Sequence, residues 1–216
     1  MAAFLRGISP KPRRRWSRDA SLAAVALGAV GGFLVLSRFL GGRRVSAFDR
    51  GIVNGMGRAR RPVSNALVQG LTFFGSAPGA GGVATAATVC LLARREPLLA
   101  AQIAMGALGG ITAELGIKRF FRRARPTLLE PLETVAVSST SFPSGHSTAA
   151  ASIYLSMAFV ASRRSGHRLA LVSGASALAL AVGASRVYVG VHWPTDVLSG
   201  LAIGTAWACA TEAAMG

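Results

Sequence analysis

Cysteine, histidine and acidic residues are all scarce in this chain. Its 216 residues include two cysteines, three histidines and 8 Asp+Glu. Cys90 and Cys209 both lie inside apolar runs, which indicates packing residues and argues against a disulfide framework. No Cys/His or carboxylate cluster has the spacing of a zinc site, so the sequence predicts neither metal ligands nor a cofactor.

Charge is also low overall, and it is largely of one sign. Charged residues make up 15% of the chain, well under the ~25% of a typical soluble domain. Hydrophobic residues make up 51%, and the mean hydropathy is +0.47, so the composition indicates a membrane protein. The net charge of +16 comes in short clusters between apolar runs, which fits phospholipid headgroups and topology signals better than nucleic acid.

Long apolar runs are what the chain does contain. Residues 21–40 form the first run, and at ~1.5 Å per residue they cover ~30 Å of hydrocarbon. This run is too long for the apolar core of a signal peptide, so we expect a retained first span. The sequence predicts an all-α polytopic membrane protein with six transmembrane helices, at residues 21–40, from near 78 to 93, 97–117, 147–162, 169–184 and 196–214.

The sequence divides into an N-terminal tail and a membrane-embedded domain. We interpret residues 1–18 as a basic N-terminal tail and residues 19–216 as a membrane-embedded domain. After the first span, apolar residues recur at helical spacing among arginines, which predicts an interfacial helix lying on the membrane. Those apolar residues are Val45, Phe48, Ile52 and Met56.

A first polar motif, KRFFRRARP, follows the third span at residues 118–126. Lys118 and Arg125 are seven residues apart, two turns of a helix, so both can reach one anion; Arg122 lies on the same stripe. Alone, such a cluster is better explained by side chains that extend to lipid headgroups. Glu114 lies one turn before Lys118, and a buried ion pair or a cavity-facing polar group is favoured for it over a catalytic role.

A second motif, FPSGHS, precedes the fourth span. Ser144 and Gly145 place a hydroxyl and free backbone N–H groups at the positive end of a helix dipole, where an anion is favoured. His146 would project from the same turn. As a helix cap alone, this motif is unremarkable.

A third motif, SRVYVGVHWPTD at residues 185–196, joins the fifth and sixth spans. Pro194 suits the first turn of a helix, so His192 would lie just outside that helix and Asp196 about one turn further in. A carboxylate there can bind one imidazole nitrogen and leave the other free to act as nucleophile or base. Arg186 adds a cation to the same stretch.

The span count places these motifs together. The regions 118–146 and 185–196 are separated by two spans, so both lie on one membrane face whichever way the protein is inserted. Phosphate-binding cations, two histidines and an aspartate then meet at one interface, which a composite anion site explains better than three unrelated clusters.

The three motifs, in this order and spacing, resemble the signature of the type 2 phosphatidic acid phosphatase superfamily, also called lipid phosphate phosphatases. That signature reads Lys, six residues, Arg-Pro; then Pro-Ser-Gly-His; then Ser-Arg, five residues, His, three residues, Asp. Every position of it is filled here. The expected spans extend the resemblance over about residues 20–214 and match the bacterial integral-membrane branch.

The resemblance and the residue types together imply a metal-independent phosphatase with a phosphohistidine intermediate. His192 would attack phosphorus while Asp196 holds its tautomer, and His146 would protonate the leaving group and then activate water. The expected substrate-binding groups are the cations and donors Lys118, Arg125, Ser144, Gly145 and Arg186.

The implied substrate is a lipid phosphate or diphosphate in the bilayer. We favour a polyprenyl diphosphate such as undecaprenyl diphosphate, ahead of phosphatidylglycerophosphate or phosphatidic acid and of a polyprenyl-phosphosugar phosphate. Membrane lipids are the expected partners and nucleic acid is not; the sequence does not indicate an oligomeric state. A non-catalytic lipid-phosphate binding or transport protein is the alternative from another class, and the intact histidine pair argues against it.

We expect a multi-pass protein of a bacterial plasma membrane with its site on the extracytoplasmic face. With the N-terminus inside, the outer loops carry slightly more Lys and Arg than the inner ones, against the positive-inside rule. Setting aside the motif cations, which phosphate binding explains, reverses this balance and favours an outward site.

Overall fold

The structure, a computed structural model, describes residues 12–40, 45–132 and 140–216. Every regular element within these ranges is helical, which confirms the all-α prediction. In chain order the elements are α1 (Pro12–Leu40), α2 (Ala47–Arg58), α3 (Pro62–Phe73), the π-helical segment η2 (Ala77–Gly81), α4 (Gly82–Ala93), α5 (Pro97–Lys118), α6 (Gly145–Ser165), α7 (Arg168–Tyr188) and α8 (Pro194–Met215).

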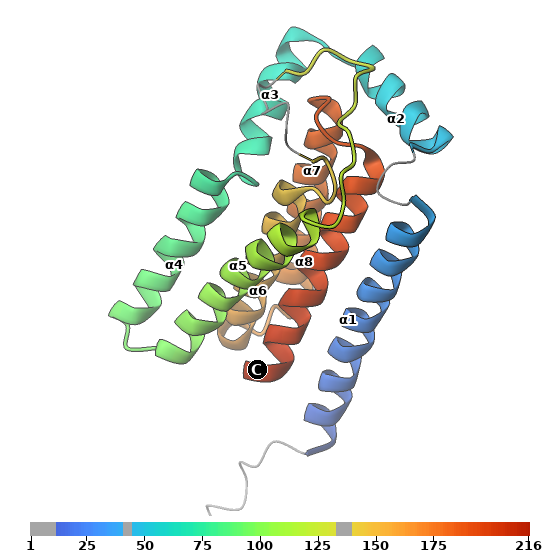
Figure 1. Cartoon of the computed structure of the whole chain (residues 1–216). Helices are drawn as coiled ribbons and strands as arrows, with labels where there is room; N and C mark the ends of the chain where they lie inside the picture. The colour runs from blue at the N-terminus through green and yellow to red at the C-terminus, as the bar shows by residue number, and fades with distance from the viewer. Residues whose placement is uncertain (1–11, 41–44, 133–139) are drawn as a thin grey trace, which may run out of the picture.

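The long helices form a bundle around α6 (Figure 1). α6 packs against α5, α7 and α8 and is buried along most of its length, whereas α1 lies against α8 on the outside. α2, the start of α3 and the described residues that follow α5, up to 132, lie toward the end of the bundle opposite the C-terminus (Figure 1). α1 begins at Pro12, so it includes residues 12–18 of the predicted basic tail; residues 1–11 of that tail lie outside the described residues.

Four helices in the described ranges are long and apolar enough to cross a membrane: α5, α7, α8 and residues 20–38 of α1. A fifth is obtained if α3 and η2–α4 are counted as one span bent by 46°. α6, predicted as the fourth span, is not among them, because its serines and arginines lower its hydropathy. The prediction of six transmembrane helices is therefore not confirmed.

The structure differs from the sequence prediction at the start of the second span. Pro78 lies in the glycine- and alanine-rich stretch GSAPGAGG, and here the chain forms η2 between α3 and α4. Ser76 caps this segment, its side chain accepting a hydrogen bond from the Gly79 N–H. The apolar sequence thus continues through a bend, and helix begins at Pro62, well before the predicted start.

Small residues allow the central helices to approach closely. A Cβ on Gly204 of α8 would lie 2.5 Å from the Thr148 carbonyl oxygen of α6, and one on Gly200 would lie 2.5 Å from that of Ser144. On α5, Gly110 packs in the same manner on Ser152 of α6. The contacts of Gly200 and Gly204 hold the start of α6 against α8.

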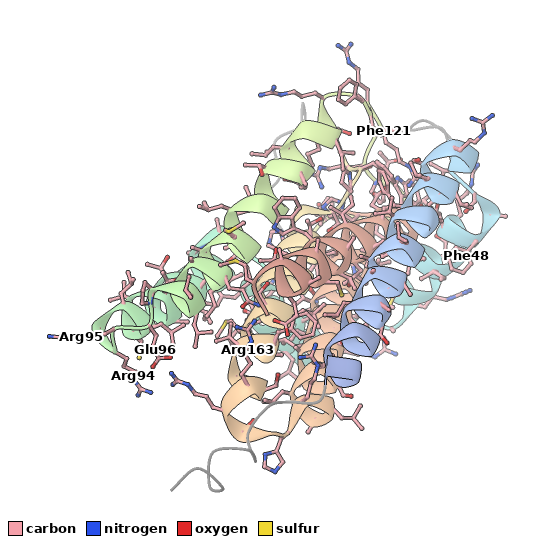
Figure 2. All side chains as sticks on the ribbon, turned by 90° about the horizontal axis from the view of Figure 1, so that it is seen from below. Phe48, Arg94, Arg95, Glu96, Phe121 and Arg163 are labelled. Atoms are coloured by element: carbon pink, nitrogen blue, oxygen red, sulfur yellow. The ribbon has the colours of Figure 1, made fainter. Side chains whose placement is uncertain are left out.

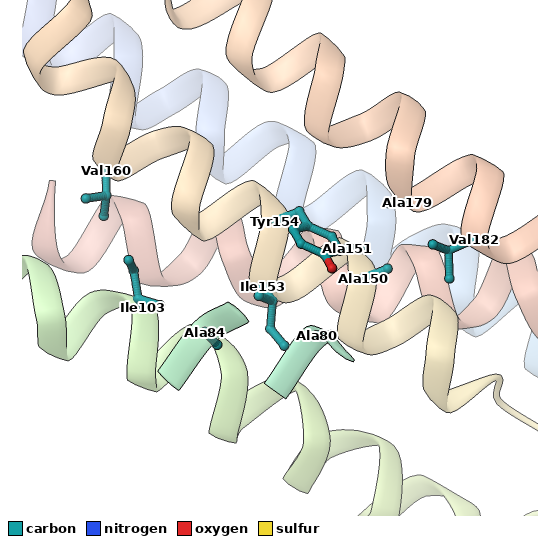
Figure 3. Packing of buried hydrophobic residues seen from close by; sticks show 10 residues of the cluster. All are labelled: Ala80, Ala84, Ile103, Ala150, Ala151, Ile153, Tyr154, Val160, Ala179 and Val182. Atoms are coloured by element: carbon teal, nitrogen blue, oxygen red, sulfur yellow. The ribbon is translucent and has the colours of Figure 1, made fainter. Parts of the chain in front are cut away.

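The largest apolar cluster also centres on α6 (Figure 3). It is built of small and medium side chains, consistent with helices packed at short range. From α6 it takes Ala150, Ala151, Ile153, Tyr154 and Val160, and from the other elements Ala80, Ala84, Ile103, Ala179 and Val182.

A separate polar cluster lies at the end of the bundle that carries the C-terminus. Glu212 of α8 is fully buried and accepts from Arg163, Arg168 and Gln102 at 2.7–2.9 Å. Its carboxylate is thereby satisfied, as a charge at membrane depth requires. Figure 2 shows further charged side chains at this end, with Arg94, Arg95 and Glu96 at the turn between α4 and α5.

Candidate active site

Four helix termini meet at the opposite end of the bundle. The C-termini of α5 and α7 and the N-termini of α6 and α8 carry the three sequence motifs. The Ser144 N–H donates to the Asp196 carbonyl oxygen at 3.0 Å, which joins the second motif to the third. Arg125 Nη1 donates to the Val191 carbonyl oxygen at 2.8 Å, which joins the first motif to the third. The structure therefore brings all three motifs together.

His192 lies in the short connection between α7 and α8 and is buried, with 3% of its surface exposed. α8 begins at Pro194, so Asp196 is in its first turn, as the sequence predicts. The His192 Nδ1 faces Asp196 Oδ2 at 3.6 Å, which is longer than a hydrogen bond. On the other side of the ring, Nε2 lies 3.3 Å from Arg125 Nη1.

The surroundings of His192 keep its imidazole neutral. Burial is the main cause that lowers its pKa, to about 4. The facing Asp196 carboxylate opposes this shift, while the positive charges of Arg125 and Arg186 add to it. A neutral imidazole with one nitrogen directed at a guanidinium is suited to attack an anion that the guanidinium binds.

His146 is the second residue of α6 and is half-buried. It lies within electrostatic reach of Arg186, His192, Lys118 and Arg125. The chain also passes close to it at Gly75, where a Cβ would lie 3.0 Å from the His146 Cβ. The second imidazole therefore faces the same cluster of cations as the first.

Ser144 and Gly145 form the N-terminal turn of α6. Ser144 is the N-cap, and its Oγ accepts from Ser147 Oγ at 2.9 Å, so its own hydroxyl hydrogen can still be donated. A Cβ on Gly145 would lie 3.0 Å from Glu114 Oε1, so a larger residue would require this carboxylate to shift. Glu114 is itself buried and ion-paired with Lys118, in agreement with the expected buried pair.

The predicted cations occupy different depths. Lys118 is the last residue of α5, and Arg125 lies on the extended segment that follows. Both side chains are partly exposed. Arg186 is in the last turn of α7, is 2% exposed and donates from Nη1 to Thr72 Oγ1 of α3. Arg122 is exposed, because α5 ends before it and the helical stripe does not continue.

Sequence reasoning missed Arg123, the most deeply placed cation of the first motif. It is 1% exposed, and its guanidinium contacts Asp196, Thr195 of α8 and Asp49 of α2. The available signal was Pro126, which favours an extended chain before it. Because alternate residues of an extended chain share a side, Arg123 and Arg125 point inward together.

The fold and the site define a class: a helical membrane protein with two imidazoles and a cluster of cations at one end of its bundle. A family model, described as the PAP2 superfamily, matches residues 97–215, which carry all three motifs. The chain belongs to the PAP2 superfamily, and the resemblance identified from its motifs is confirmed.

Curated relatives are similar over parts of the chain. Phosphatidylglycerophosphatase B of Bacillus subtilis is 42% identical over 41% of this chain and 44% of its own length. Lipid A 1-phosphatase of Rhizobium johnstonii is 36% identical over 45% of this chain and 39% of its own length. The chain thus spans less than half the length of these relatives. Decaprenylphosphoryl-5-phosphoribose phosphatase of Mycolicibacterium smegmatis is 37% identical over 66% of this chain and 74% of its own length.

The fold is also similar to that of a solved structure. The crystal structure of a transmembrane PAP2-type phosphatidylglycerolphosphate phosphatase from Bacillus subtilis superposes with a TM-score of 0.78 at 26% identity. The match covers 86% of this chain and 93% of the other.

Proposed function

We propose that the protein is a metal-independent lipid phosphatase that hydrolyses a phosphate ester, or a diphosphate, at the membrane surface. One observation carries this proposal: the buried His192 imidazole lies between the Asp196 carboxylate and the Arg125 guanidinium. A histidine so placed has a base-orienting group on one nitrogen and a phosphate-binding group on the other.

In the first step, His192 Nε2 attacks phosphorus, forming an N–P bond as the bond to the lipid oxygen breaks. His146 donates a proton to that leaving oxygen. Arg125, Lys118 and Arg186 neutralise the phosphoryl oxygens, and the Ser144 hydroxyl and Gly145 N–H add hydrogen bonds.

In the second step, water attacks the phosphohistidine while His146 takes the proton of the water. The N–P bond breaks, phosphate leaves, and His192 returns to its neutral form. Asp196 keeps the ring in one orientation through both steps.

The protein cations supply the charge that a metal ion would otherwise provide. Within the described residues, no three His, Cys, Asp or Glu side chains are grouped so that they could hold a metal ion. We therefore expect activity to persist in EDTA.

The proposed substrate is a lipid phosphate, and the names of the relatives indicate which lipid phosphates to consider first. Relatives of which this chain covers about three quarters are named decaprenylphosphoryl-5-phosphoribose phosphatases. Others are named phosphatidylglycerophosphatase B and lipid A 1-phosphatase. These names support a polyprenyl-phosphosugar phosphate or phosphatidylglycerophosphate; undecaprenyl diphosphate, our first choice from sequence, stays a prediction.

We also propose that α6 is the sixth span. It has 21 residues, and its neighbours α5, α7 and α8 bury its polar side chains away from lipid. A helix shielded in this way can cross a bilayer without being apolar all round. With α3–η2–α4 as one bent span, this gives six spans and a site on the membrane face opposite the start of α1. We propose, as from the sequence, that this face is extracytoplasmic.

The test is phosphate release by the purified protein in detergent, across a panel of these lipid phosphates and polyprenyl diphosphate. We expect release that EDTA does not reduce and that His192→Ala lowers at least about a thousandfold. The matched control is His167→Ala, since His167 is exposed at the turn between α6 and α7. Release that EDTA abolishes, or that survives His192→Ala, would contradict the mechanism; no release from any substrate would favour a non-catalytic lipid-binding protein.

A further inference from the structure

We propose that Asp49 and Arg123 are positioning residues of this reaction, which fix Asp196 and set the charge around His192. This inference rests on the proposed function. It ties α2, the helix predicted to lie on the membrane surface, directly to the site.

The first link joins Arg123 to Asp196. Arg123 Nη1 donates to Asp196 Oδ1 at 2.6 Å, while the Trp193 N–H donates to Oδ2 at 2.9 Å. Oδ2 is the oxygen that faces His192. Arg123 thus holds the far side of the carboxylate and leaves the near side directed at the imidazole.

The second link joins Arg123 to Asp49. Arg123 Nη2 donates to Asp49 Oδ2 at 2.7 Å. Thr195 connects the same groups: its hydroxyl lies 2.7 Å from Arg123 Nη1 and 2.9 Å from Asp49 Oδ1, and its N–H donates to Oδ1 at 3.1 Å. Asp49 therefore holds both Arg123 and the first turn of α8.

The burial of these side chains strengthens the electrostatic interactions between them. Asp49 and Asp196 are 0% exposed and Arg123 is 1% exposed, so water screens none of them. Two carboxylates share one guanidinium, so the group Asp49–Arg123–Asp196 carries one net negative charge. With Arg123 alone, the charge of Asp196 would be neutralised; Asp49 offsets this and preserves the negative field on the imidazole.

A merely structural role for Asp49 is the competing explanation, since Asp49 also forms a capping box with Ser46 at the start of α2. The two roles move the acid limb of the kcat/KM pH profile in opposite directions. Loss of a negative charge lowers the proton affinity of His192 and moves the limb to lower pH. A loosened site admits water and moves it up, toward the ordinary histidine value near 6.5.

The other charged groups that face His192 stay the same in this comparison. They come from each element around it: Asp196 from α8, Arg125 from the extended segment, Arg186 from α7 and His146 from α6. The substrate's own ionisation is also common to all variants, so a difference in the acid limb reports the protein.

The experiment compares Asp49→Asn with Glu130→Gln in the full-length protein, using phosphate release from the best lipid phosphate of the panel. Glu130 is an exposed carboxylate, so its variant removes the same charge from the surface. For Asp49→Asn we expect kcat to fall about tenfold or more with KM little changed, and the acid limb to move to lower pH. Glu130→Gln should match the unmodified protein, and Asp49→Glu should restore part of kcat.

A second pair of variants, at Thr195, tests the inference if Asp49→Asn does not fold. Thr195→Val removes the hydroxyl that joins Asp49 to Arg123 without changing any charge, whereas Thr195→Ser keeps it. We expect kcat to fall severalfold in the first and to stay unchanged in the second. An acid limb that stays or rises in Asp49→Asn, or equal kcat in the Thr195 pair, overturns the inference; absence of activity in the unmodified protein would instead overturn the proposed function.

Discussion

At the scale of single residues, burial decides the state of the imidazole that is to react. An exposed histidine titrates near pH 6.5, but His192 is 3% exposed and its pKa falls to about 4. Asp196 alone would hold a proton on the ring; burial and the cations Arg125 and Arg186 outweigh it. The same cations that bind phosphate thus keep the nucleophile free of a proton.

This predicts the pH dependence of the reaction. The reactive neutral form of His192 is present above its pKa and is lost as the pH falls through about 4. After correction for the fraction of dianionic substrate, the loss of kcat/KM that His192 protonation causes should therefore be centred near pH 4. Initial rates across the acidic pH range, with folding monitored in parallel, check the prediction. A corrected decline centred near 6.5 would show that His192 is solvated in solution.

At the scale of the elements, close contact between α6 and α8 aligns the turns that carry Ser144 and Asp196. Gly204 permits this contact, because a Cβ there would lie 2.7 Å from the Ala151 Cβ. Gly204→Ala should therefore destabilise the protein by about 1–3 kcal/mol through overpacking.

Gly174 on α7 is the matched control, since a Cβ at this position meets nothing within 4 Å. Gly174→Ala should be neutral or stabilise the helix by up to about 1 kcal/mol. Thermal unfolding of both variants in the same detergent measures the difference. Equal midpoints would mean that the two helices are less tightly packed than described.

The elements also show which features the sequence could predict. α5 and α8 were placed well because prolines at 97 and 194 mark their starts and charged or polar motifs border them. The bend at η2 was missed, since a glycine- and alanine-rich apolar stretch fits a span, a bend or a loop equally. Arg123 was missed because the helical period was extended past Lys118, where the chain is no longer helical.

Asp49 shows a different reason why part of the site could not be predicted. Its segment is an amphipathic helix whose pattern describes only one face and says nothing of what the other contacts. The bond to Arg123 spans 74 residues and depends on how α2 packs at the end of the bundle. Motif residues can be identified from local spacing, whereas groups that support them from another element cannot.

At the scale of the whole molecule, the distribution of charge bears on how the protein is inserted. Counting cations in the loops slightly disfavoured an outward site until the motif cations were set aside. The structure supplies a physical reason to do so for three of these cations: Arg123 and Arg186 are buried, and Lys118 is paired with Glu114. Cations that are enclosed or paired inside the protein interact less with the membrane surface than free loop cations do.

This argument predicts that the active-site end faces outward, and single cysteines can test it. In a chain with Cys90 and Cys209 changed to alanine, Thr127→Cys marks the loop after Arg125 and Ser165→Cys marks the end of α6 at the opposite end of the bundle. Both positions are exposed, and both substitutions keep the charge of the loops. A membrane-impermeant maleimide applied to intact cells should label Thr127→Cys alone, and disrupted cells should label both. Labelling of Ser165→Cys alone in intact cells would place the site on the cytoplasmic face, and lipid substrates of the inner leaflet would then replace those proposed.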